Sequence, residues 1–205
     1  MRHLVVSLTI ALAMSVLSTA AFANSVTVYQ INESNVGFVN PVGTVTVVGN
    51  TNCPCSSLTV SVQLSPGFHF AAGNVFGFNL PTGAATISNV VLPGAPSVTV
   101  VFNPNNALDG FGKYTVNFDT TKTATLGNTL SFTISGTGLL TNNFALSSGG
   151  TGTSAFTMHV FGPLAGGGTG TGFGGGFSTV PEPGTMSLLG TGLLGLAGAV
   201  RRRFS

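Results

Sequence analysis

The residues with the most obvious chemical potential are two cysteines on either side of one proline, Cys53-Pro54-Cys55. Paired cysteines form disulfides in exported proteins, and together with histidines they can bind zinc or carry out redox chemistry. His69 and His159 could complete a set of four ligands. The one-residue spacing lacks the two-residue interval of thioredoxin-like and zinc motifs. We therefore expect a disulfide and no metal, with metal or redox chemistry as the alternative.

Carboxylates are the second candidate chemistry. Asp109 and Asp119 could be read as the acid pair of a glycosidase. However, Asp109 precedes Gly110 in a turn sequence, where aspartate is common, and Asp119 lies near Lys122, which favours a solvated ion pair. Asp and Glu together number 4, and His numbers 3. Because this is little material for acid–base catalysis, we expect no enzyme, no catalytic residues and no cofactor.

A glycine-rich stretch contains the spacing G-x-G-x-x-G at Gly170, Gly172 and Gly175. In a dinucleotide-binding fold this motif follows a strand and opens a helix. We expect neither element here, since Pro181 follows closely. A tract of Gly, Thr and Phe buries too little surface to offset chain entropy. We therefore interpret residues 165–179 as a flexible linker.

The elements that would position these residues are strands. Polar and apolar residues alternate with a period of two in many segments, which is typical of strands with one buried face. The segments are residues 25–31, 42–48, 58–64, 75–80, 85–92, 97–103, 113–119, 128–135 and 154–161. A single helical turn is expected at 140–146. The pattern predicts an all-β fold, an antiparallel β-sandwich of jelly-roll type, over residues 24–164.

The alternation also predicts which side chains share a face of each strand. In the first segment Val26, Val28 and Gln30 share one face, and in 97–103 Val98, Val100 and Phe102 do. For three other segments we expect the shared face to be buried: Leu58, Val60, Val62 and Leu64; Tyr114, Val116 and Phe118; and Leu130, Phe132 and Ile134.

Charge is scarce in the body of the chain. Between residues 24 and 179 there are three acids and two bases, a net charge of 2 − 3 = −1, from Glu33, Asp109, Lys113, Asp119 and Lys122. The pI near 8.8 therefore comes from the two ends. Without a basic face, we expect no nucleic-acid partner.

Residues 1–23 have the parts of a secretory signal peptide. Arg2 supplies the positive start, residues 4–17 the apolar centre, and Ala21 and Ala23 the small-x-small cleavage site. The mature protein would begin at residue 24. The alternative is an N-terminal anchor that is retained.

Residues 180–205 have the features of a second targeting segment, at the C-terminal end of the sequence. Pro181 and Pro183 are unfavourable inside a helix, so the opening of the segment is expected to be extended. Residues 185–200 carry no charge. About 15 helical residues cover roughly 22 Å, less than the ~30 Å hydrocarbon core of a bilayer. We predict a single, weak transmembrane helix that contacts the membrane through 185–200, with an ordinary buried helix as the alternative.

The cluster Arg201, Arg202 and Arg203 fixes the predicted orientation. Moving three arginines across a bilayer would cost about 8–10 kcal/mol. They should therefore remain cytoplasmic, which places the body of the protein on the other side of the membrane.

This C-terminal segment resembles the PEP-CTERM sorting signal of Gram-negative bacteria that make extracellular polysaccharide. The resemblance rests on Val180, Pro181, Glu182 and Pro183, on the Leu/Gly-rich span and on the arginine cluster. It implies an exosortase, a membrane-embedded transpeptidase-like enzyme, as partner, with the secretion machinery. Cleavage near the Pro-Glu-Pro would release the body or transfer it to the cell surface or matrix, after transient anchoring in the inner membrane.

These observations favour an exported, non-enzymatic surface or matrix protein with a structural or adhesive role in exopolysaccharide or biofilm, and with exopolysaccharide as a further candidate partner. The alternative is a carbohydrate-binding module, and a hydrolase ranks third. Sugar sites commonly stack the ligand on exposed aromatic rings. The chain has no Trp, and its tyrosines are Tyr29 and Tyr114.

Overall fold

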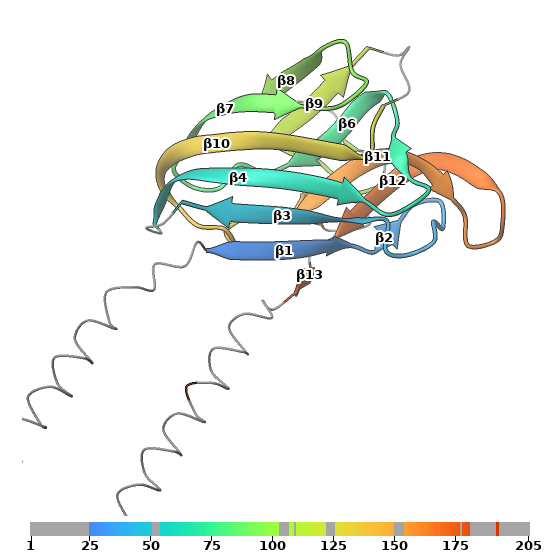
Figure 1. The fold of residues 1–205 in the computed structure, drawn as a ribbon, viewed down its shortest axis with the longest axis horizontal. Helices are drawn as coiled ribbons and strands as arrows, with labels where there is room; N and C mark the ends of the chain where they lie inside the picture. Colours follow the sequence, from blue (N-terminus) through green and yellow to red (C-terminus); the bar gives the residue numbers. More distant parts are fainter. Residues whose placement is uncertain are drawn as a thin grey trace, which may run out of the picture.

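The computed structural model describes residues 25–50, 54–102, 107–108, 110–121, 126–149, 154–176, 178–180 and 192. Its strands form two antiparallel sheets that pack face to face (Figure 1). The prediction of an all-β sandwich is confirmed. The sheet that contains the first strand is called sheet A below, and the other is sheet B.

Sheet A has the strand order β13-β1-β3-β4-β10-β7. Its strands are β13 (Ser178–Val180), β1 (Val26–Ile31), β3 (Gly43–Gly49), β4 (Cys55–Leu64), β10 (Thr129–Leu139) and β7 (Ala84–Val91). Sheet B has the order β2-β12-β11-β6-β9-β8, and β5 also pairs with β11. Its strands are β2 (Glu33–Ser34), β12 (Thr169–Gly176), β11 (Phe156–Pro163), β6 (Gly73–Phe78), β9 (Val116–Thr120), β8 (Val98–Phe102) and β5 (His69–Phe70).

Phenylalanines from both sheets meet in the core between them. Phe132 of β10 packs edge-on against Phe118 of β9, with ring centroids 4.8 Å apart, and is stacked with Phe78 of β6 at 5.3 Å. Phe76 and Phe156 extend this cluster along sheet B, with centroids 5.8 Å apart. Aromatic pairs in these geometries add roughly 0.5–1.5 kcal/mol each beyond the area that they bury. The cluster therefore holds the two sheets together.

The predicted inward faces of β4 and β10 are confirmed, since Leu58, Val60, Val62, Leu64, Leu130, Phe132 and Ile134 are all buried. Val116 and Phe118 are buried in the main core, but Tyr114 is buried in a separate cluster. In β1 the buried residues are Tyr29 and Ile31, whereas Val26 and Val28 lie on the other, half-buried face. Phe102 at the end of β8 is 54% exposed.

The separate cluster covers the outer face of sheet B, the face turned away from sheet A. Leu108, Phe111 and Tyr114 form it, and Phe173 of β12 packs against it. Two glycines make room for these side chains. A Cβ at Gly175 of β12 would lie 2.5 Å from the ring of Phe111, and a Cβ at Gly77 would collide with Leu108.

The prediction of a flexible linker over 165–179 is wrong, because residues 169–176 form β12 and 178–180 form β13. β12 pairs with β11 over all eight residues, from Thr169 opposite Pro163 to Gly176 opposite Phe156. The entropy argument fails because neighbouring strands supply the backbone partners, and neighbouring side chains fill the space above the glycines. The helical turn expected at 140–146 is also wrong: residues 141–142 form a turn, and 143–147 are irregular.

Candidate functional site

The C-terminal strand β13 lies against β1 at the edge of sheet A. The pairs are Val28 with Val180, Tyr29 with Thr179 and Gln30 with Ser178. The start of the predicted sorting segment is therefore part of the sandwich. Of the sequence-predicted site residues, Val180 lies in β13, whereas Pro181, Glu182, Pro183, Arg201, Arg202, Arg203, Ala21 and Ala23 lie outside the described residues.

Tyr29 fixes β1, the strand that pairs with β13, to the rest of the sandwich. The Tyr29 hydroxyl donates a hydrogen bond to the carbonyl oxygen of Thr141 at 3.1 Å, and its ring packs edge-on against Phe156 at 4.8 Å. Burial raises the pKa of Tyr29 to about 12, because the phenolate would lose its hydration. The hydroxyls of Ser25 and Thr27 each lie 2.8 Å from that of Thr141.

The chain passes from one sheet to the other immediately before β13. β12 ends at Gly176 in sheet B, and β13 begins at Ser178 in sheet A. At Gly176 the backbone of β12 approaches that of β1 so closely that a Cβ would collide with the carbonyl oxygen of Gln30. The Gly176 carbonyl accepts a hydrogen bond from the amide of Ala155 at 3.1 Å. This crossing point is therefore tightly constrained.

Cys55 opens β4, is fully buried and is disulfide-bonded. The sequence contains one other cysteine, Cys53, which lies outside the described residues. Within the described ranges no three His, Cys, Asp or Glu side chains come together in a way that could hold a metal ion.

The two histidines suggested as ligands lie on the outer face of sheet B, where each packs against a phenylalanine. His159 stacks on Phe173 across the β11–β12 pair, with centroids 4.5 Å apart and planes 14° apart, and its Nδ1 lies 3.0 Å from the carbonyl oxygen of Ala72. His69 packs on Phe161 at 4.9 Å. These contacts are those of cross-strand sheet residues.

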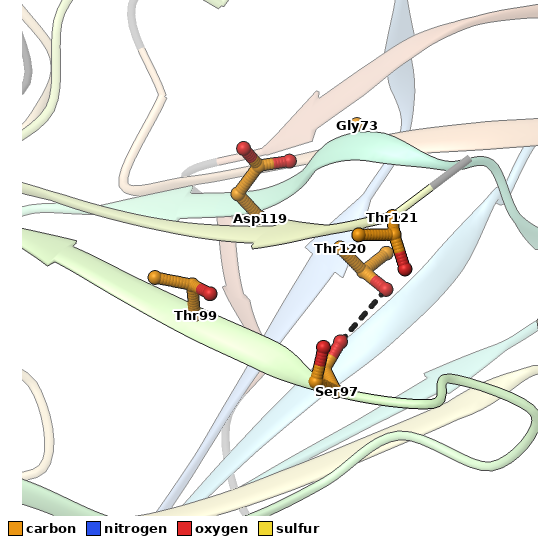
Figure 2. A pocket seen from close by; sticks show the side chains of 6 residues that line it. All are labelled: Gly73, Ser97, Thr99, Asp119, Thr120 and Thr121. Carbon is orange, nitrogen blue, oxygen red and sulfur yellow. Dashed lines mark hydrogen bonds between the residues drawn. The ribbon is translucent and has the colours of Figure 1, made fainter.

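Asp119 lies in a surface pocket of about 300 Å³ at one end of β8 and β9 (Figure 2). Its lining consists of Gly73, Ser97, Thr99, Asp119, Thr120 and Thr121. Thr120 donates a hydrogen bond from its hydroxyl to the carbonyl oxygen of Ser97 at 2.9 Å. Asp119 lies opposite Thr99 on the neighbouring strand, and its carboxylate points away from Thr120 and Ser97 (Figure 2). Asp109 and Lys122, the other residues considered with Asp119, lie outside the described residues.

Comparison with known proteins identifies the C-terminal segment. Residues 179–203 match the PEP-CTERM protein-sorting motif. The PEP-CTERM motif implies an exported protein that is sorted to the cell surface and processed by an exosortase. The resemblance noted in the sequence is therefore confirmed for this segment. No curated protein and no solved structure matches the chain, so the family of the sandwich is unidentified.

The PEP-CTERM motif overlaps the fold, because its match begins at residue 179, inside β13. Sequence reasoning missed this strand and placed the boundary of the sandwich at residue 164. A local signal was present, since Thr179 and Val180 are β-branched and favour extended structure. Among the residues that the structure describes, no helix has the length and apolar character needed to cross a membrane. The span predicted at 185–200 lies outside them, apart from residue 192.

Proposed function

We propose that this exported protein is a non-enzymatic component of the cell surface or extracellular polysaccharide matrix, with a structural or adhesive role. The observation that supports this proposal is that the PEP-CTERM motif begins inside β13, which pairs with β1 of the sandwich. The folded domain and the start of its sorting motif are thus joined without an intervening linker. Such an arrangement suits a passive surface domain.

The surface of the sandwich supports this role. The charged residues of the described ranges are Glu33, Lys113 and Asp119. The outward positions of β4 carry Ser, Thr and Gln instead, and those of β7 carry Thr, Ser and Asn beside Ala85 and Val91. Neutral hydroxyl and amide groups can hydrogen-bond to an uncharged polysaccharide. Because such contacts involve no net charges, salt screens them little.

Sorting is tested by comparing the full chain with a chain that ends at Val180, which keeps β13 and removes the rest of the PEP-CTERM motif. We expect the full chain in the surface and matrix fractions, and the truncated chain in the soluble exported fraction. Identical fractionation of the two forms would contradict sorting through this motif.

The matrix role needs a separate measurement. A strain that lacks the protein should retain less polysaccharide in its biofilm and withstand less shear, and the full chain should restore both properties. Correct sorting of the protein combined with an unchanged matrix in the deletion strain would leave the export conclusion intact and disprove the structural role.

The pocket at Asp119 favours a second candidate, a carbohydrate-binding module. Its hydroxyls and its carboxylate are the groups that pair with sugar hydroxyls in polar sites. If it binds glycans, Asp119→Asn and Thr99→Ala should each weaken retention on purified exopolysaccharide, and Glu33→Gln, which removes an acid elsewhere on sheet B, should not. Equal retention of all three variants would rule out this pocket as the glycan site.

A further inference from the structure

Three of the four sheet edges carry features that discourage pairing with another chain. At one edge of sheet B, β2 has only two residues. At one edge of sheet A, β13 has three residues and is followed in sequence by Pro181, which has no N–H to donate. At the other edge of sheet A, β7 contains Asn89 with a positive φ of 53° and has register shifts against β10. Short strands, prolines and irregularities of this kind are how proteins protect sheet edges.

The fourth edge, β8, is longer than β2 and β13 and has neither a positive φ nor a register shift, and the nearest prolines, Pro96 and Pro104, lie two residues outside its ends. Its sequence is Val98-Thr99-Val100-Val101-Phe102, without charge, proline or glycine, and it pairs regularly with β9 over all five residues. No strand pairs with its other side in the part of the chain that the structure describes. Val101 is 36% exposed and Phe102 54% exposed. A regular, apolar edge strand favours the addition of another strand.

We propose that β8 is a self-association edge, which pairs antiparallel with β8 of a second copy of this chain. The strand is complementary to itself about Val100. In that register Val98 faces Phe102 of the second copy, and Thr99 faces its Val101. Each contact then joins β-branched or aromatic residues, the cross-strand pairs that stabilise antiparallel sheets.

The charge distribution favours a second copy over a charged partner. The nearest charged residue among those described is Asp119, which is paired with Thr99 on the adjacent strand β9. In the proposed register the two Asp119 residues lie three strand spacings apart, about 14 Å measured across the sheet, and are also offset along it. That distance exceeds the ~8 Å Debye length at physiological salt, so the two copies do not repel each other strongly.

The position of β8 is remote from β13, where the sorting motif begins. In Figure 1, β8 lies at the top of the molecule, and β1 and β13 lie at the bottom. Two copies joined through β8 would therefore carry their β13 strands on their far sides. This inference rests on the strand edge alone and is independent of the matrix role proposed above.

The test uses the full chain, purified in mild detergent, and measures its mass against concentration by light scattering and sedimentation. Val101→Lys places a charge on the outward face of β8, and Val91→Lys is the matched control on the protected edge β7, where Val91 is 57% exposed. We expect the unmodified chain and Val91→Lys to dimerise equally. Val101→Lys should dimerise at least tenfold more weakly, which corresponds to about 1.4 kcal/mol.

A second variant, Phe102→Lys, guards against a folding defect in Val101→Lys, because Phe102 is more exposed and its replacement leaves the core intact. Thermal unfolding of each variant checks the fold. Weakened dimers in both β8 variants, with native unfolding, support the proposal. A chain that stays monomeric at high concentration, or folded β8 variants that dimerise like Val91→Lys, would overturn it. Either result leaves sorting by the PEP-CTERM motif unaffected.

Discussion

Replacement of Gly176 by alanine should destabilise the sandwich, because the added Cβ has no room. It would collide with the carbonyl oxygen of Gln30 and lie 3.0 Å from Cα of Ile31. Both are backbone atoms of β1, so no side-chain rotation relieves the contact, and the two strands must separate. Overpacking of this kind costs about 1–3 kcal/mol, and a backbone obstacle places the expected loss at about 2–3 kcal/mol.

The matched control is Gly170→Ala in the same strand. The atoms nearest to its Cβ would be those of the Leu164 side chain, at 3.3 Å or more. Since alanine also restricts the unfolded chain, we expect a change between zero and about 1 kcal/mol of stabilisation. Urea and thermal unfolding of the full chain, followed by circular dichroism, measure the difference between the two variants. For a chain of this size, Gly176→Ala should lower Tm by about 4–12 °C relative to the unmodified protein.

Equal stability of the two variants would refute this reasoning. Residues 169–176 would then behave as the linker expected from composition, and the crossing from β12 to β13 would not hold the sorting segment against β1. A large loss in Gly170→Ala would also contradict it, since the atoms nearest to that Cβ belong to the side chain of Leu164.

Three further predictions test the polar and aromatic interior. The raised pKa of Tyr29 means that its stabilising effect is complete below pH 10 and is lost as pH rises to about 12. Tyr29→Phe should therefore remove up to about 2–3 kcal/mol of this alkaline loss in urea unfolding at successive pH values, and an unchanged pH profile would contradict the assignment. Asn117 is 1% exposed, and its side-chain amide has no hydrogen-bond partner among the described residues. Asn117→Leu should raise stability by about 1–3 kcal/mol, whereas a comparable loss on thermal unfolding would reveal a bound partner such as water. Phe132→Ala should cost about 3–5 kcal/mol by leaving a cavity between the sheets, and a loss below 1 kcal/mol would mean that the sheets are not joined there.

Most of the strands could be predicted because their pattern is local. In β4 and β10, apolar residues alternate with Ser, Thr and Gln, so one face had to be buried in either strand. In β1 the alternation correctly grouped Val26, Val28 and Gln30 on one face, but it could not say which face is buried, because both faces carry apolar side chains. There the choice was made by Tyr29, whose hydroxyl reaches Thr141 and whose ring reaches Phe156. Those partners lie more than a hundred positions away in the chain.

The candidate site divides in a similar way. Pro-Glu-Pro, the apolar span and the arginines stand next to one another in the sequence, and the motif could be recognised without any fold. The pocket at Asp119 could not be predicted, because it joins Ser97 and Thr99 to Gly73 and Thr120 through strand pairing.

The sequence by itself determined the class of fold, the scarcity of charge in the body and the sorting motif, since each depends on composition or on residues close together in the chain. Only the tertiary structure decided that a glycine-rich stretch becomes β12, that the sorting motif begins on the edge of the sandwich, and that β8 is the one regular edge left unpaired among the described strands. The physical reason is that a strand acquires its backbone partners and its packing from other strands. A segment without an apolar pattern of its own, such as β12, becomes ordered only when distant neighbours surround it.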